Sequence, residues 1–378
     1  MHIADSPSAG LGAARSSKDA SRAPGPQGFA EHVSKVDPGG VVRRAEAAGL
    51  HAGAPLSFVR TPADAFALAA PALLGAEVRL AELLGSEVPV VAAIGSYLAE
   101  SGGKRLRPML TALAAGLVGW PATPDPRALS GLMCVGELIH LGSLLHDDVV
   151  DDGVLRRGRP AAQRVYGNAA VILTGDFCLA RAVWLAAEEG GHAPVTALAE
   201  AVTNMAEGEV LQLQRAGNLD TTLDEYLETV DKKSAALIAW CASAPALAAG
   251  QLEAAEILAR YGRAVGVAFQ IADDVLDYGG PTGKPPGQDL RERKLTLPLV
   301  LAMERMPGLR ARLEAAAPPA EELPAVLAEI RASGAPADAL AEARRRVEDA
   351  LDGLAALPAS PWRDALAVLG RYLVEREA

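Results

Sequence analysis

Residues 134–152 read CVGELIHLGSLLHDDVVDD, an apolar run that ends in a cluster of aspartates. A second run, AVGVAFQIA at 264–272, leads in the same way to DDVLD at 273–277. In both runs the apolar residues recur at spacings of three and four, which predicts helices. The fold is therefore expected to consist of helices, two of which carry carboxylates at their ends.

Both clusters have the pattern DDxxD. Their aspartates are Asp147, Asp148 and Asp151 in the first and Asp273, Asp274 and Asp277 in the second. Helical carboxylates at i and i+4 lie on one face and repel each other by roughly 0.2–0.5 kcal/mol per pair. Mg2+ reverses that repulsion, because it binds carboxylate oxygens and leaves places for substrate phosphates. Two such faces across a cavity predict a metal site that grips a diphosphate. The alternative, a solvated acidic helix end, is disfavoured by the apolar run before each cluster.

Composition limits the class of protein. The chain has 378 residues, 50% of them hydrophobic, and a net charge of -11. The negative charge argues against a nucleic-acid partner. Aromatic residues make up only 4%, which favours Ala- and Leu-rich helices over a β-sandwich.

The cysteines and the apolar segments bear on location. Cys134, Cys178 and Cys241 lie far apart in apolar stretches and form neither a metal spacing nor an even disulfide set. They are expected to be reduced and buried in a cytoplasmic protein. The N-terminus lacks an apolar signal region, and no run is expected to reach the ~18–20 apolar residues of a membrane span.

The order of segments predicts one all-α domain of about a dozen helices. Residues 1–60, rich in Ala, Gly, Ser and Pro, are expected to be a mostly disordered extension, and residues 61–378 the folded domain. Thr61-Pro62 is a helix-start signal. Helical periodicity is expected in Phe66–Leu84, Val88–Glu100, Met109–Leu117, Ala128–Val150, Ala169–Glu188, Thr196–Leu213, Thr222–Leu247, Glu253–Tyr278, Leu297–Met303, Ala320–Ser333, Ala337–Leu354 and Pro361–Glu375.

Two basic motifs are candidates for binding phosphate. GGKRLRP at 102–108 supplies Lys104, Arg105 and Arg107, and LRRGRP at 155–160 supplies Arg156 and Arg157. Arginine offers a planar fork to phosphate and lysine a point charge. The alternatives are a surface basic turn for the first motif and weak exposed salt bridges to neighbouring aspartates for the second.

Further polar residues accompany the helices that carry the acidic clusters. His140 lies two turns before Asp147 on the same face and is expected to be a substrate ligand, the alternative being a satisfied core residue. His146 is expected to be structural. Lys233, Ser234, Gln270 and Lys284 would complete a polar ring on an otherwise apolar bundle.

In this order and spacing, the motifs resemble those of the trans-isoprenyl diphosphate synthases, or polyprenyl synthetases. The resemblance runs from about Phe66 to Arg376. It rests on GGKRLRP, ELIHLGSLLHDDVVDDGVLRRGRP, Gly208-Glu209, KSA, GVAFQIADDVLD, GKPPGQDL and KLTLP. It implies the isoprenoid synthase fold, a large helical bundle around a deep central cavity.

The resemblance also implies roles for individual residues. The six aspartates would hold Mg2+ on an allylic diphosphate, with Asp147, Asp148, Asp151, Asp273, Asp274 and Lys233 as the catalytic set. Arg156, Lys233 and Lys284 would grip that diphosphate, and Gln270 and Ser234 would line the same site. Lys104, Arg107, His140 and Arg157 would bind isopentenyl diphosphate. The allylic C–O bond would ionise, and the isopentenyl double bond would attack the cation and then lose a proton.

Product length is expected to depend on Gly142 and Ser143, one turn before the first acidic cluster. Farnesyl-type members often carry bulky aromatics there, so small residues predict a medium- to long-chain all-trans product, with geranylgeranyl diphosphate as the alternative. Two other readings are a terpene cyclase, disfavoured by the basic motifs, and a non-catalytic subunit, disfavoured by two intact acidic clusters. By analogy with the family, the protein is expected to be a homodimer.

Overall fold

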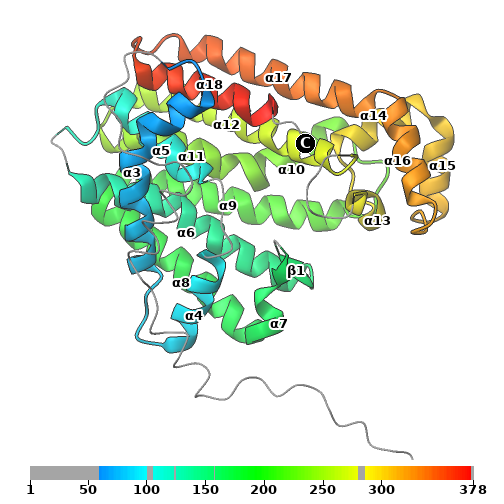
Figure 1. The fold of residues 1–378 in the computed structure, drawn as a ribbon, viewed down its shortest axis with the longest axis horizontal. Helices are drawn as coiled ribbons and strands as arrows, with labels where there is room; N and C mark the ends of the chain where they lie inside the picture. Colours follow the sequence, from blue (N-terminus) through cyan, green and yellow to red (C-terminus); the bar gives the residue numbers. More distant parts are fainter. Residues whose placement is uncertain (1–58, 100–104, 123–124, 157, 280–285, 376–378) are drawn as a thin grey trace, which may run out of the picture.

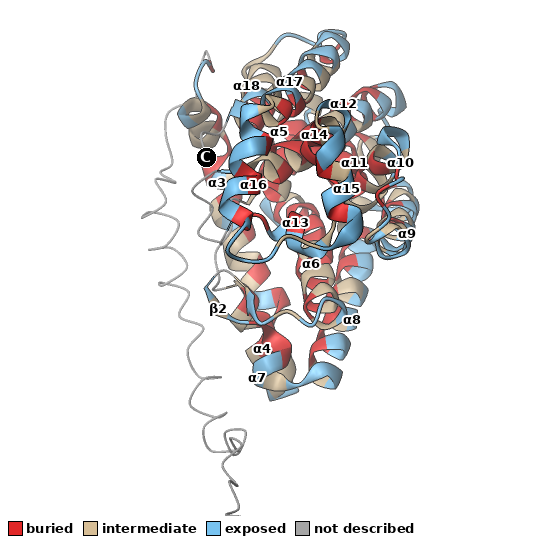
Figure 2. Cartoon of the chain, turned by 90° about the vertical axis from the view of Figure 1, so that its right-hand side faces the viewer, coloured by how far each residue is buried: buried red, intermediate tan, exposed pale blue. Residues whose placement is uncertain are grey.

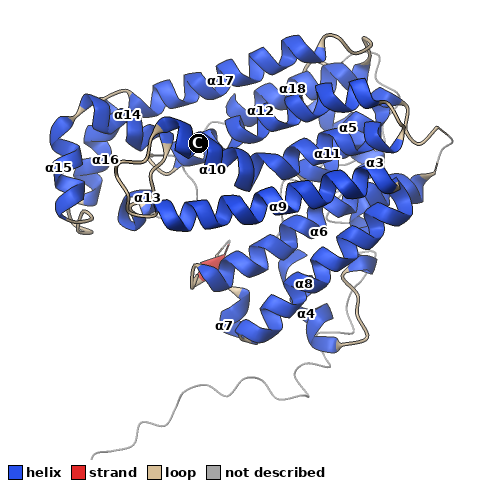
Figure 3. Cartoon of the chain, turned by 180° about the vertical axis from the view of Figure 1, so that it is seen from behind, coloured by secondary structure: helices blue, strands red, loops and turns tan. Residues whose placement is uncertain are grey.

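The computed structural model describes residues 59–99, 105–122, 125–156, 158–279 and 286–375. Its α-helices are α3 Pro62–Leu83, α4 Pro89–Ala99, α5 Leu106–Val118, α6 Pro126–Val150, α7 Ala162–Tyr166, α8 Asn168–Leu185, α9 His192–Arg215, α10 Leu223–Val230, α11 Ala236–Ala248, α12 Leu252–Leu276, α13 Gln288–Glu292, α14 Leu297–Arg305, α15 Pro307–Ala315, α16 Leu323–Ala332, α17 Ala335–Leu354 and α18 Pro361–Glu375. Two π-helical turns are η1 Ala186–Gly190 and η2 Asp231–Ala235, and a hairpin pairs β1 Leu155–Arg156 with β2 Arg159–Pro160. Apart from that hairpin, the regular structure in these ranges is helical, as predicted (Figure 3).

The first helix begins at the predicted signal. The Thr61 hydroxyl accepts a hydrogen bond from the backbone N–H of Asp64, and the Asp64 carboxylate accepts one from the backbone N–H of Thr61. Pro62 follows at the first helical position, where its missing N–H costs nothing. The extension predicted for residues 1–60 lies, up to residue 58, outside the described residues.

The helices stack in successive layers (Figure 1). From one side of the bundle to the other, α17 packs on α12, α12 on α11 and α11 on α9, while α6 packs on α8. Figure 1 shows α13 to α16 gathered at one end of this stack. Buried residues face inward between the layers (Figure 2). The two helices that carry the acidic clusters, α6 and α12, are thus internal parts of the bundle.

The turn η2 joins α10 to α11 without a break in the helical course of the chain. Only part of the predicted helix Thr222–Leu247 is therefore regular α-helix, because π geometry occupies its middle. Single π turns often lie at functional sites, and this one carries Lys233 and Ser234. Gly208 on α9 allows the close approach, since a Cβ atom there would clash with the backbone of Lys233.

Some elements were missed in the sequence. The short helices α7, α13 and α15 and the β1–β2 hairpin lie in stretches where no element was expected. In α15 only Leu309 and Leu313 are buried, so its nine residues offer just two apolar positions to a periodicity argument. Elements of this length depend on packing more than on pattern.

Two helices in the described ranges are long and apolar enough, by length and composition, to cross a membrane. They are Pro126–Val150, whose most apolar window is 78% buried, and Asn168–Gly190, whose window is 39% buried. The expectation that no apolar segment is long enough to span a membrane is therefore wrong for these two helices. Burial marks the first, α6, as a core helix of the bundle, whereas the second leaves an apolar face exposed.

The cysteines behave as predicted. Cys134, Cys178 and Cys241 are free thiols buried in separate places of the bundle. Burial raises the pKa of Cys178 and of Cys241 to about 12, so both remain protonated at neutral pH.

Candidate active site

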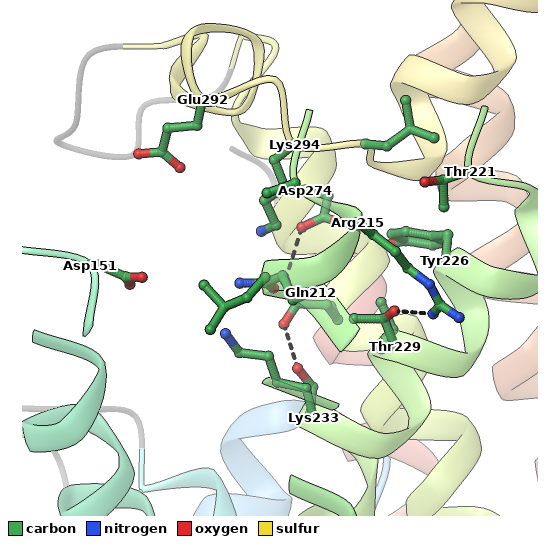
Figure 4. Close-up of a pocket in the computed structure, with 16 residues that line it drawn as sticks. Asp151, Gln212, Arg215, Thr221, Tyr226, Thr229, Lys233, Asp274, Glu292 and Lys294 are labelled. Carbon is green, nitrogen blue, oxygen red and sulfur yellow. Dashed lines mark hydrogen bonds between the residues drawn. The ribbon is translucent and has the colours of Figure 1, made fainter. Parts of the chain in front are cut away.

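Residues from both acidic clusters meet at one cavity of about 210 Å³. Of the predicted site residues, it brings together Asp151, Lys233, Ser234, Gln270 and Asp274. Figure 4 shows Asp151, at the end of α6, across an open space from Lys233, Lys294 and Asp274. The cavity is also lined by Gln212, Arg215, Tyr226 and Glu292, none of which was singled out in the sequence.

In the first cluster, Asp147 is half-buried and Asp151 is exposed, while Asp148 is turned into the protein. Burial raises the pKa of Asp147 to about 6; Lys233 opposes this shift, and the charges of Glu209 and Asp151 add to it. Burial also raises the pKa of Asp151. Asp147 and Asp151 lie one turn apart, and the charge of Glu209 acts on both. Carboxylates grouped in this way form a site that a cation would stabilise.

Asp148 has a different role from its neighbours. It is 3% exposed, and its Oδ1 accepts a hydrogen bond from Nε of Arg156 at 2.5 Å. Its Oδ2 is buried and has no hydrogen-bond partner within the described ranges. Arg156 lies on β1, so the hairpin closes over the end of α6. Arg156 therefore pairs with Asp148, whereas the exposed Asp152 pairs with Arg164.

The second cluster repeats this division. Asp273 is half-buried on α12, and Asp274 is 4% exposed. Asp274 Oδ1 accepts a hydrogen bond from Nε2 of Gln270 at 2.9 Å, and its Oδ2 accepts one from the hydroxyl of Tyr226 at 2.7 Å. The Ser234 hydroxyl donates to Oε1 of Gln270 at 2.9 Å. Ser234 and Gln270 thus align Asp274 as well as lining the cavity.

Asp277, the last aspartate of the second cluster, caps a helix. Its Oδ1 accepts the backbone N–H of Gln288 at 3.1 Å, and its Oδ2 accepts that of Asp289 at 2.9 Å. These donors are the first amides of α13, which have no partners inside the helix. That all six aspartates hold Mg2+ stays a prediction. In this structure Asp277 holds α13, and Asp148 and Asp274 accept hydrogen bonds from protein donors.

Two lysines bring positive charge to the cavity. Lys233, on η2, forms an ion pair with Glu209 of α9. Lys294 lies 3.7 Å from Oδ1 of Asp289. Burial alone would lower the pKa of Lys294, but Asp274 and Asp289 raise it, so this lysine stays charged. Burial raises the pKa of Asp289 to about 7.

Lys294 and Asp289 were present in the motifs KLTLP and GKPPGQDL, but neither received a role from the sequence. In the sequence each is only a charged residue beside an apolar segment, and that pattern alone does not indicate a functional site. For Tyr226, in α10, the sequence carried no sign of its role.

The basic motif before α5 is divided by the structure. Arg105 is bound by two glutamates, Glu77 of α3 and Glu137 of α6. Arg107 is half-buried, and the burial of its side chain lowers its pKa. Its Nε has no hydrogen-bond partner among the described residues. Lys104, Arg157 and Lys284, predicted to bind substrate, lie outside the described residues.

Residues upstream on α6 separate into two faces. His140 and Ser143 are half-buried on the side of Asp147, and the Ser143 hydroxyl donates to the His140 carbonyl at 2.9 Å. Gly142 instead faces α8, where an added Cβ atom would lie 3.0 Å from the Gly175 carbonyl oxygen. The expectation that Gly142 lines the path of the product is therefore replaced by a packing role against α8. The role of Ser143 in product length stays a prediction.

His146 is structural, as expected. Its Nε2 lies 3.2 Å from the carbonyl oxygen of Ile172 and 3.3 Å from Oδ1 of Asp176, both on α8. This contact fixes the end of α6 against α8, on a different side from Asp147.

Comparisons with known proteins identify relatives of this chain. The family model for polyprenyl synthetase matches residues 88–331. Octaprenyl diphosphate synthase of Escherichia coli (strain K12) is 36% identical over 318 residues, which cover 82% of this chain and 97% of that protein. The all-trans-nonaprenyl-diphosphate synthase (geranyl-diphosphate specific) of Rhodobacter capsulatus is 36% identical over 301 residues, which cover 78% of this chain and 92% of that protein.

A solved structure extends the match to three dimensions. The polyprenyl synthase of Caulobacter crescentus CB15, complexed with calcium and isoprenyl diphosphate, superimposes with a TM-score of 0.79. It is 37% identical, and the match covers 86% of this chain and all of that one. Since the family model spans more than half of the sequence and the relatives are covered almost completely, the chain belongs to the polyprenyl synthetase family.

Proposed function

We propose that the protein is a Mg2+-dependent prenyltransferase that condenses an allylic diphosphate with isopentenyl diphosphate. Its product would be an all-trans polyprenyl diphosphate of medium to long chain. The observation that carries this proposal is that residues of both acidic clusters, Asp151 and Asp274, line one cavity together with Lys233 and Lys294. Carboxylates opposite lysines suit a substrate that is itself an anion bridged to metal.

The carboxylates fit a divalent cation. The half-buried Asp147 and Asp273 and the exposed Asp151 would hold it. The buried Asp148 and Asp274 accept hydrogen bonds from Arg156 and Tyr226. Among the described residues no three His, Cys, Asp or Glu side chains already form a metal cluster, so substrate phosphate would supply the remaining oxygens. The calcium in the Caulobacter crescentus relative supports a divalent ion. When bound, such an ion supplies positive charge to the leaving diphosphate.

The residues of the chain have separate tasks in the reaction. Lys233, Lys294 and Arg156 would stabilise the charge that grows on the diphosphate as the allylic C–O bond breaks. The isopentenyl double bond then attacks the allylic cation to form the new C–C bond, and the proton lost from the adduct passes to the departing diphosphate. The apolar core of the bundle would keep water from the cation.

Two observations favour a longer product over geranylgeranyl diphosphate. Ser143, small and half-buried beside Asp147, leaves room on the wall of α6. The relatives described above are named for octaprenyl and nonaprenyl products. A non-catalytic subunit is disfavoured, because both acidic clusters are intact and meet at one cavity.

The proposal is tested by incubating the protein with isopentenyl diphosphate, farnesyl or geranyl diphosphate and Mg2+. Chromatography of the dephosphorylated products then gives chain length. We expect a ladder that ends beyond the geranylgeranyl length and disappears when EDTA removes the metal. A product that stops at geranylgeranyl supports the alternative, and a cyclic hydrocarbon contradicts the proposal.

We also propose that the protein works as a homodimer in the cytoplasm. Along α8, the apolar side chains Ile172, Leu173, Val183 and Trp184 are 39–64% exposed. Positions 172 and 183, like 173 and 184, are eleven residues apart, so they share one face of the helix. An exposed apolar face of this kind is typical of a protein interface, and a second copy would cover it. The three buried free thiols support the cytoplasmic location.

A further inference from the structure

Arg105 lies in a three-residue ion cluster at the junction of three helices. Its Nη2 donates to Oε2 of Glu77 at 3.1 Å, and its Nε donates to the other oxygen of the same carboxylate. Its Nη1 donates to Oε1 of Glu137 at 2.7 Å. The side chains of Arg105, Glu77 and Glu137 are 16%, 22% and 6% exposed. All three guanidinium nitrogens are therefore engaged by carboxylates, which leaves this arginine poorly placed to bind phosphate.

The backbone of Arg105 shows what the cluster holds. Arg105 has φ 48° and ψ 36°, the left-handed conformation, which is unfavourable for a residue with a Cβ atom. Its carbonyl accepts the N–H of Met109 at 3.0 Å and so begins α5. The two glutamates hold the side chain of this strained residue through three hydrogen bonds. The ion cluster therefore sets where α5 starts and how it is turned.

Arg107 depends on the same region of α6. Its Cβ lies 3.5 Å from the position that a Cβ atom would take at Gly136, directly before Glu137 in sequence. Burial lowers the pKa of Arg107, and the charge of Glu137 opposes that shift. Gly136 thus leaves space for Arg107, and the carboxylate of Glu137 binds Arg105.

We infer that Glu77 and Glu137 are positioning residues, which hold Arg105 so that Arg107 is presented to isopentenyl diphosphate. Arg105 is then a structural member of the basic motif and not a ligand of the substrate. This inference rests on the function proposed above. It assigns a role in substrate affinity to Glu77, a residue of α3 that belongs to none of the sequence motifs.

The test is a set of charge-neutral variants of nearly the same shape. Glu77→Gln and Glu137→Gln each remove one carboxylate charge, and Arg105→Lys keeps the positive charge but loses the fork. Glu82→Gln is the matched control, since Glu82 is also on α3 and is also paired with an arginine, Arg79, but at the surface. Initial rates are measured with each substrate varied in turn, and isopentenyl diphosphate binding to the full chain is measured by calorimetry.

We expect both glutamate variants to raise the KM and the Kd for isopentenyl diphosphate about tenfold or more, because a hydrogen bond to a charged group is lost. The KM for the allylic substrate should stay within about twofold, which a general loss of structure would not produce. Arg105→Lys should fall between these variants and the wild type, and Glu82→Gln should match the wild type.

If Arg105 itself bound phosphate, releasing it from a glutamate would leave the affinity unchanged or improve it, and that outcome overturns the inference. Should Glu137→Gln fail to fold, Glu77→Gln, at the more exposed carboxylate, still decides. An inactive wild type would count against the proposed function alone, because calorimetry with inorganic diphosphate still compares the variants.

Discussion

Tyr226 donates its hydroxyl hydrogen to Oδ2 of Asp274 over 2.7 Å, between two buried side chains. Gln270 occupies the other oxygen of that carboxylate. Asp148 in the first cluster is bound by Arg156 in a comparable way. In each cluster the second aspartate is thus held by the protein, while the first, Asp147 or Asp273, remains half-buried.

Tyr226→Phe should weaken the site by removing one of the two donors that hold Asp274. Loss of a hydrogen bond to a buried charged group costs about 1.5–3 kcal/mol, so we expect kcat/KM to fall at least about tenfold. The control is Tyr261→Phe, whose hydroxyl donates to the Leu366 carbonyl at 2.6 Å on another side of α12. That variant should lower the thermal stability but not kcat/KM. Equal kinetic losses in the two variants would show that stability alone is responsible.

Asp147→Asn and Asp273→Asn should each lower turnover by about a hundredfold or more, since a carboxylate that would bind the metal becomes an amide. Circular dichroism should show unchanged helix content. Asp152→Asn serves as the control, because Asp152 lies in the same cluster but is exposed and paired with Arg164. Near-normal turnover in either of the first two variants would refute their assignment to the metal.

Ser143→Phe should shorten the products while the first condensation continues. The added ring would narrow the path of the growing chain along α6, beside His140. Gly142→Phe should behave differently. With an added Cβ atom already 3.0 Å from the Gly175 carbonyl oxygen, the larger side chain has to displace α8. We expect this variant to unfold at a lower temperature. Chromatography of the products and thermal unfolding separate the two effects, and an unchanged product ladder for Ser143→Phe would place the path elsewhere.

Leu173→Asp and Trp184→Asp should convert a dimer into a 39.0 kDa chain that sediments as a monomer. Each places a charge in the apolar face of α8, where a partner would have to bury it. Leu252→Asp is a suitable control, because Leu252 is 66% exposed and lies on α12. A wild type that is already monomeric at working concentration would contradict the proposed dimer.

Much of the fold could be predicted from the sequence, because the long helices carry sustained apolar periodicity. The start at Thr61-Pro62 and the long helices with acidic ends are confirmed. Periodicity has no information on which aspartate of a cluster turns outward, since that depends on donors such as Tyr226 from another helix. It also treated Gly142 as an open space, whereas α8 fills that space.

The charged residues show the same limit. Arg105 and Arg107 are two positions apart in one basic motif, and composition alone gives them one role. The structure separates them, because Glu77 and Glu137 arrive from α3 and α6 to bind only the first. For Lys294 the sequence indicated no functional role at all. Only the folded position of α12 shows that the charge of Lys294 lies close to Asp274.

The π turn η2 has a consequence for how this chain can change in evolution. A π turn contains one residue more than the equivalent α-helical turn, and each residue of an α-helix advances the angular phase by about 100°. Deleting one residue within Asp231–Ala235 would restore ordinary helical hydrogen bonding, but it would rotate α10 and α11 relative to each other. Either Lys233 would leave the cavity or the buried face of α11 would turn out of the core. Lineages that keep this reaction should therefore tolerate substitutions in the segment far better than changes in its length.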